Sequence, residues 1–169
     1  MEVLTPRLSL IFVSTLAAAA LTGATGCREE DREAPAPRAG ACIGKVLRGP
    51  IPAWADAGFS RPRPRMPHAI SRDGKLSALL LGDPLSSPPA RGHANKILWV
   101  PRTAPRSDSN LRIRARRYAG NRPVGPVVTR AVQGGPGPSI VNLPAPGCWR
   151  LLLAWAGEID RIDLRYRGS

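Results

Sequence analysis

The sequence has few of the residues that build metal centres. Its 169 residues include only two histidines and three cysteines. Neither His68 nor His93 sits in an H-x-x-x-H, H-E-x-x-H or C-x-x-C spacing, which would bring several ligands to one ion. No motif therefore supports a metal site, and we predict no cofactor.

Motifs for nucleophilic catalysis and phosphate binding are also missing. Asp83, Ser86 or Ser87, and His93 could form a hydrolytic triad on paper, but no G-x-S-x-G turn frames either serine. The glycine-rich run at 134–138 contains prolines where a phosphate-binding loop needs N–H donors. We predict that the protein is not an enzyme, with a small exported hydrolase lacking a recognisable motif as the alternative.

Long uninterrupted segments are scarce. The chain contains 19 prolines and 17 glycines, and both residue types interrupt helices. This composition excludes a long helical bundle, and the length supports one domain of ordinary size.

The first 26 residues have the pattern of an export signal. A short, weakly positive region, Met1–Arg7, precedes Leu8–Leu21, an apolar run of about 14 residues that only serine and threonine interrupt. A membrane span needs about 20 apolar residues. We therefore interpret the run as a signal sequence and predict export rather than integration into the membrane.

Small residues at 22–26 lead to Cys27, and this pattern resembles the lipobox of bacterial lipoprotein precursors. The resemblance covers the first 27 residues. It implies a signal peptide at 1–26, a lipid on Cys27 and an anchor on the extracytoplasmic face of the cell membrane. Two or three acyl chains hold a protein stably at a membrane, whereas one does not. An ordinary secretory signal that leaves Cys27 as a thiol is the alternative.

The segment 28–41 has the composition of a solvated tether, because it combines dense mixed charge with Ala-Pro repeats. With lipidated Cys27 it forms the region 27–41, and 42–169 is the folded domain. After the four basic and five acidic residues of 1–41 are set aside, the domain retains 21 basic and seven acidic residues, a net charge of +14.

Short alternating segments in the domain predict strands. In Leu111–Arg116, apolar residues alternate strictly with arginines, so one face is buried and the other solvated. Cys148–Trp155 and Ile159–Tyr166 alternate as well and flank a turn at Ala156–Glu158, which predicts a terminal hairpin. Further candidates are 69–71 and 76–81, separated by an Asp-Gly turn, and 96–100, 127–132 and 139–143. About seven short strands predict an all-β sandwich.

The stretch from Gly137 to Tyr166 carries a second resemblance. Its Pro-Ser-Ile-Val, Leu-Pro and Pro-Gly-Cys-Trp-Arg-Leu segments and its closing hairpin look like the end of immunoglobulin-like β-sandwich domains in uncharacterised bacterial lipoproteins. The likeness implies an immunoglobulin-like architecture and no assigned activity. Trp149 directly follows Cys148, which departs from the antibody pattern.

With Cys27 assigned to lipid, Cys42 and Cys148 remain as an even pair in an exported and therefore oxidising setting. We predict a disulfide between them. A reactive thiol at Cys148 is the alternative, but no histidine is adjacent in sequence to activate it.

Several further residues have structural interpretations. We expect Trp99, Trp149 and Trp155 in the core, and Trp54 is the tryptophan to test for contact with a sugar. The run 61–67, which alternates Arg and Pro, predicts an extended loop. Asp160 and Asp163 lie among arginines on one alternating strand, so cross-strand ion pairs are expected.

The basic surface is the most distinctive feature for function. We single out Arg112, Arg114, Arg116 and Arg117 as a surface for an anionic partner, either anionic lipid or an envelope polymer. Nucleic acid is disfavoured because an exported domain is separated from cytoplasmic DNA. Since 22 of the 25 basic residues are Arg, coding bias is the competing explanation. The predicted function is a non-enzymatic binding or structural module of the envelope, with an accessory subunit of an envelope protein complex as the alternative.

Overall fold

The computed structural model describes residue 42 and residues 44–56, 58–105 and 109–168. The predicted signal peptide, the lipidation site Cys27 and the tether lie outside the described residues. Within the described part of the chain, no helix is long and apolar enough to span a membrane.

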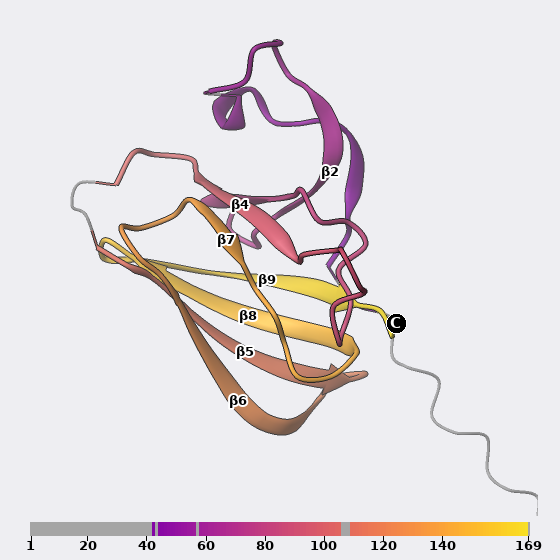
Figure 1. Cartoon of the computed structure of the whole chain (residues 1–169). Coiled ribbons are helices and arrows are strands. Elements are labelled where there is room, and N and C mark those ends of the chain that lie inside the picture. Colours follow the sequence, from indigo (N-terminus) through magenta and orange to yellow (C-terminus); the bar gives the residue numbers. More distant parts are fainter. Residues whose placement is uncertain (1–41, 43, 57, 106–108, 169) are drawn as a thin grey trace, which may run out of the picture. The chain divides into compact units, whose positions relative to one another are not determined.

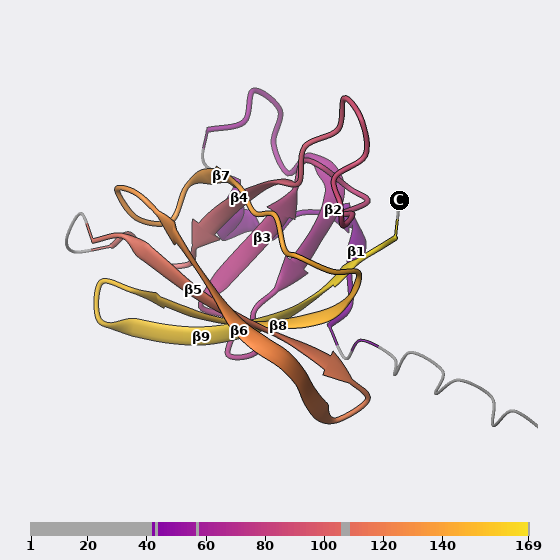
Figure 2. The same cartoon turned by 60° about the horizontal axis from the view of Figure 1, so that its bottom comes forward.

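The described residues form two antiparallel sheets, which Figures 1 and 2 show packed against each other. The five-stranded sheet has the order β1-β2-β3-β4-β7 and the four-stranded sheet the order β6-β5-β8-β9. The prediction of an all-β sandwich is confirmed, while the immunoglobulin-like kinship stays a prediction. The strands are β1 (Leu47–Pro50), β2 (Arg65–Ile70), β3 (Leu76–Leu80), β4 (Lys96–Pro101), β5 (Leu111–Ala119), β6 (Arg122–Val132), β7 (Pro138–Ile140), β8 (Gly147–Trp155) and β9 (Glu158–Tyr166).

The main core lies between the sheets and contains the inward residues of both. Trp99, Trp149 and Trp155 are exposed by only 1%, 2% and 4%, which confirms their predicted place in the core. The apolar residues of β5 and β9 that alternate in sequence are buried as expected. The terminal hairpin is also confirmed, since β8 pairs with β9 from Gly147–Tyr166 to Trp155–Glu158.

The two described cysteines are joined. Cys42 and Cys148 form a disulfide across 106 positions of sequence, with Cα atoms 5.3 Å apart. The predicted pairing is confirmed, and it fixes the beginning of the domain to strand β8.

The expected loop at 61–67 is only partly correct. Strand β2 starts at Arg65, so Arg65, Met66 and Pro67 pair with β1 instead of forming a loop. β1 was not predicted, because Leu47–Pro50 contains Gly and Pro and has no apolar alternation. An extended run becomes a strand here because a distant segment supplies its hydrogen-bonding partner.

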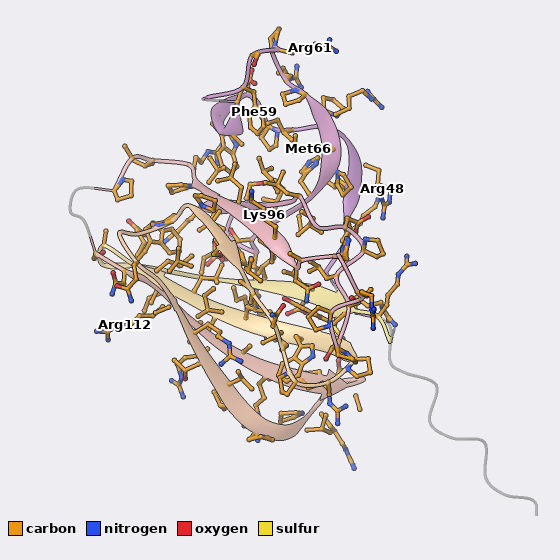
Figure 3. All side chains as sticks on the ribbon, in the orientation of Figure 1. Arg48, Phe59, Arg61, Met66, Lys96 and Arg112 are labelled. Atoms are coloured by element: carbon orange, nitrogen blue, oxygen red, sulfur yellow. A yellow bond between two sulfur atoms is a disulfide. The ribbon has the colours of Figure 1, made fainter. Side chains whose placement is uncertain are left out.

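A second, smaller cluster covers β3 on the outer side of the five-stranded sheet. The segment after β1 contains the short 3₁₀ helix η1 (Ala53–Ala55) and places Ile51 and Ala55 against Leu79 of β3; these three residues are fully buried. Phe59 and Met66, labelled in Figure 3, pack on the same cluster. β3 is therefore buried on both of its faces.

Candidate functional site

Strand β5 presents a row of three arginines on the outer side of the four-stranded sheet. Arg112, Arg114 and Arg116 are exposed, while the residues that alternate with them enter the core. Alternate residues on a strand lie about 6.6 to 6.8 Å apart on one face. The three guanidinium groups therefore form a regular line of positive charge, at the end of which Arg112 is labelled in Figure 3.

The strands beside β5 extend this row into a surface. Leu152 of β8 pairs with Arg114, and Arg150 of β8 pairs with Arg116. On β9, Arg161 pairs with Leu152 and Arg165 pairs with Cys148. We call the six outward arginines the arginine face: Arg112, Arg114, Arg116, Arg150, Arg161 and Arg165.

Arg117 does not belong to this face. It pairs with Trp149, which points into the core, and its Nη1 atom donates a hydrogen bond of 3.4 Å to the carbonyl oxygen of Pro146. Successive residues of a strand point to opposite faces, so Arg116 and Arg117 are separated by the sheet. The four arginines predicted as one surface are thus divided between its two sides.

One acidic side chain, Asp163, shares the outward positions of β5, β8 and β9. Arg150 binds it through two hydrogen bonds, with Nε–Oδ1 at 2.9 Å and Nη2–Oδ2 at 3.0 Å. These hydrogen bonds raise the pKa of Arg150. The Arg150 guanidinium also lies 4.4 Å from the centre of the Tyr118 ring. The predicted cross-strand ion pair is therefore confirmed for Asp163, and Arg150 is held between Asp163 and the Tyr118 ring.

Two shallow hollows lie on and beside the face. One, of about 310 Å³, has apolar side chains of Val127 and Leu152 among its arginines. The other, of about 380 Å³, lies beside the segment that follows Cys42 and is lined by Lys45 and Arg72 among others. Both are lined by Arg150 and Arg161, so the two hollows meet at these two arginines.

Asp160 has a different role from the one predicted. It is buried and accepts hydrogen bonds from Ser71 Oγ (2.5 Å) and from the backbone N–H groups of Asp73, Lys75 and Arg161 (3.1, 3.1 and 2.7 Å). Burial raises the pKa of Asp160, but these hydrogen bonds outweigh burial and lower it overall. The expected ion pair is wrong for Asp160, because it faces the β2–β3 turn and not the arginines of its own strand.

The residues of the hydrolytic triad considered above form their hydrogen bonds with other groups, not with one another. Within the described chain, no hydrogen bond links His93 to Asp83 or to either serine. Nor do the described residues contain three His, Cys, Asp or Glu side chains that could hold a metal ion. The observed partners are the Gly82 carbonyl for His93, Arg48 for Asp83, the Ala90 N–H for Ser86 and the Leu143 carbonyl for Ser87.

Trp54, the tryptophan proposed for sugar contact, is half-buried. It packs on the small cluster around Leu79, and the Arg102 guanidinium lies 5.8 Å from its ring centre. These contacts supply a structural role, and sugar binding at Trp54 stays a prediction.

Comparison with known protein families, curated proteins and solved structures finds no match to this chain. The candidate site is therefore defined by the chain's own residues. Arg150, Arg161 and Arg165 were not predicted as members of this surface. Their signal was present, because they alternate with the core residues of the predicted hairpin; the pairing of β8 with β5 was not visible.

Proposed function

We propose that this protein is a lipid-anchored, extracytoplasmic module of the bacterial cell envelope that binds an anionic partner without catalysing a reaction. The observation that carries the proposal is the arginine face: six arginines and one aspartate on the outward positions of three neighbouring strands. The lipobox-like sequence ending in Cys27 supports the location.

Arginine suits this role because its planar guanidinium presents several donors to phosphate or carboxylate oxygens. Each basic residue close to an anionic surface contributes about 1 kcal/mol. Arg112, Arg114 and Arg116 form no ion pair within the described residues. Their charges are therefore available to a partner, in contrast to that of Arg150.

A matched pair of triple variants tests the proposal against coding bias. Arg112, Arg114 and Arg116 are replaced together by Glu in one variant, and Arg61, Arg63 and Arg65 in the other. All six positions are exposed and each trio has the same alternate spacing. The two variants therefore change the net charge equally.

The measurement is the binding of the detergent-solubilised full chain to long-chain polyphosphate at several salt concentrations. We expect the β5 variant to lose about 100-fold in affinity, as three contacts of about 1 kcal/mol predict, and the 61/63/65 variant to lose far less. Binding should weaken as salt rises, since exposed charges are screened. Equal losses in the two variants would show that net charge alone acts and would overturn the proposal.

A further inference from the structure

We infer that the anionic partner of the arginine face is the phospholipid headgroup layer of the same membrane that carries the lipid anchor. This inference rests on the proposed function, because it takes the anchor at Cys27 and the basic binding surface as given. It adds the identity of the partner and the orientation of the domain.

The disulfide places the entering chain on the arginine face. Cys148 pairs with Tyr118 of β5 and with Arg165 of β9, and it lies two residues before Arg150 on β8. Alternate positions of a strand share one side. Cys42 is therefore held on the same side of the sheet as the arginines.

The residues that follow Cys42 stay close to this side. A Cβ on Gly44 would overlap the backbone carbonyl of Asp163, so the chain lies directly against β9. Lys45 then lines the hollow that contains Arg150 and Arg161. The entering segment thus runs along the edge of the basic surface and adds a cation to it.

The length of chain before Cys42 allows contact with the anchoring membrane. Residues 28–41 separate Cys27 from Cys42, and this length spans at most about 50 Å when fully extended. Attraction between exposed charges decays over about 8 Å at physiological salt, so the face must come close to the headgroups. A short tether makes that encounter intramolecular, at an effective concentration in the millimolar range, and individually weak contacts then suffice.

The apolar side chains of the face favour a lipid surface over a soluble polyanion. Val127, Leu152 and Ile159 are 42%, 41% and 58% exposed on the four-stranded sheet, among the arginines. Cations beside apolar side chains suit the boundary between headgroups and acyl chains. A soluble polyanion would leave these apolar side chains in water.

Two variants, each with one added cysteine, test this orientation in the full lipidated chain, in which Cys42 and Cys148 remain joined by their disulfide. Leu152→Cys places a thiol on the arginine face, and Ile140→Cys places one on β7 of the other sheet, where Ile140 is 60% exposed. Each variant is reconstituted into vesicles of phosphatidylcholine alone or with phosphatidylglycerol. The rate of modification by an uncharged, water-soluble maleimide is then measured.

We expect phosphatidylglycerol to slow modification at 152 by about 100-fold, the ratio that three basic contacts of about 1 kcal/mol each predict, and high salt to restore the rate. The rate at 140 should not change. Val127→Cys, on the same face, replaces the Leu152 reporter if that variant folds poorly. Equal rates at 152 or 127 with and without phosphatidylglycerol would overturn the inference.

The polyphosphate experiment distinguishes failure of the membrane inference from failure of the proposed function. If the detergent-solubilised chain binds polyphosphate through the β5 arginines while the reporters stay accessible on anionic vesicles, the membrane is not the partner and a soluble polyanion takes its place. If neither is observed, both the inference and the proposed function are wrong.

Discussion

On the outer face of the five-stranded sheet the chain itself covers β3, whereas the central strands of the four-stranded sheet are open on their outer face. On the first, the segment around η1 buries Leu79 completely. On the second, Leu152 occupies a central strand among arginines and remains 41% exposed. The same residue type thus meets opposite environments on the two outward surfaces of one sandwich.

The difference follows from what surrounds each leucine. Around Leu79 the outward residues of β2 and β4 include Met66, Leu98 and Val100, and an apolar patch of this kind is stabilised by a cover. Around Leu152 the paired neighbours are Arg114 and Arg161. A cover there would desolvate guanidinium groups, at a high cost unless it carried anions. A stable cover over these arginines is therefore expected to carry negative charge.

Replacing each of these leucines by alanine gives the largest expected contrast. Leu79→Ala should lower the free energy of unfolding by about 3 kcal/mol, because it leaves a cavity between β3 and the covering segment. Leu152→Ala should change it by less than about 0.5 kcal/mol, since an exposed side chain loses little. Urea denaturation of the two variants measures the difference.

The wild-type slope of free energy against urea serves as the control, because an unchanged slope shows that the unfolding transition is the same. Comparable destabilisation by the two variants would mean that the arginine face is also covered in solution. Such a result would show that Leu79 and Leu152 do not differ in how far they are covered.

The sequence predicts the two sides of a strand better than it predicts which strands meet. Alternation in 111–116 and in the terminal hairpin correctly separates inward from outward residues. If the alternation is extended by one residue beyond Arg116, it places Arg117 on the opposite side of the sheet and excludes it from the arginine face. The pairing of β5 with β8, which brings Arg150 and Arg161 to the face, joins residues far apart in sequence and has no local signal.

The packing of the η1 segment over Leu79 could not be predicted from the local sequence either. The 3₁₀ helix η1 contains Trp54 and the buried Ala55. Its position on the outer side of β3 depends on the unpredicted strand β1, which carries the chain past β2. Asp160 shows the same limit, because its partners lie in a turn 85 to 89 positions away.

Asp160→Asn tests a link between the two sheets. Asp160 lies on β9, and it receives hydrogen bonds from Ser71, Asp73 and Lys75 at the turn between β2 and β3. An amide oxygen accepts fewer of these bonds than a carboxylate and leaves buried donors unpaired. We expect a loss of about 2 kcal/mol in the free energy of unfolding near neutral pH.

The pH dependence of this loss identifies the carboxylate as its cause. The folded state lowers the pKa of Asp160, so its stabilisation is complete above the ordinary aspartate pKa of about 3.9 and declines as pH falls below it. The difference in free energy of unfolding between wild type and Asp160→Asn should therefore become smaller at acidic pH. Asp163→Asn, which alters a pair on the outer face, is the matched control with a smaller expected loss at neutral pH. A gap for Asp160→Asn that stays constant through this range would contradict the assignment.

The smallest expected effect concerns the entry of the chain onto the open face. Gly44→Ala would press a methyl group into the backbone carbonyl of Asp163, and backbone cannot move aside as a side chain end can. We expect a loss of about 1.5 kcal/mol in the free energy of unfolding, the size of a typical overpacking strain. Gly49→Ala on β1 meets nothing within 4 Å and should be close to neutral. If the two variants were equally stable by thermal and urea unfolding, the entering segment would not lie against β9. The disulfide at Cys42 alone would then hold the entering segment beside the arginines.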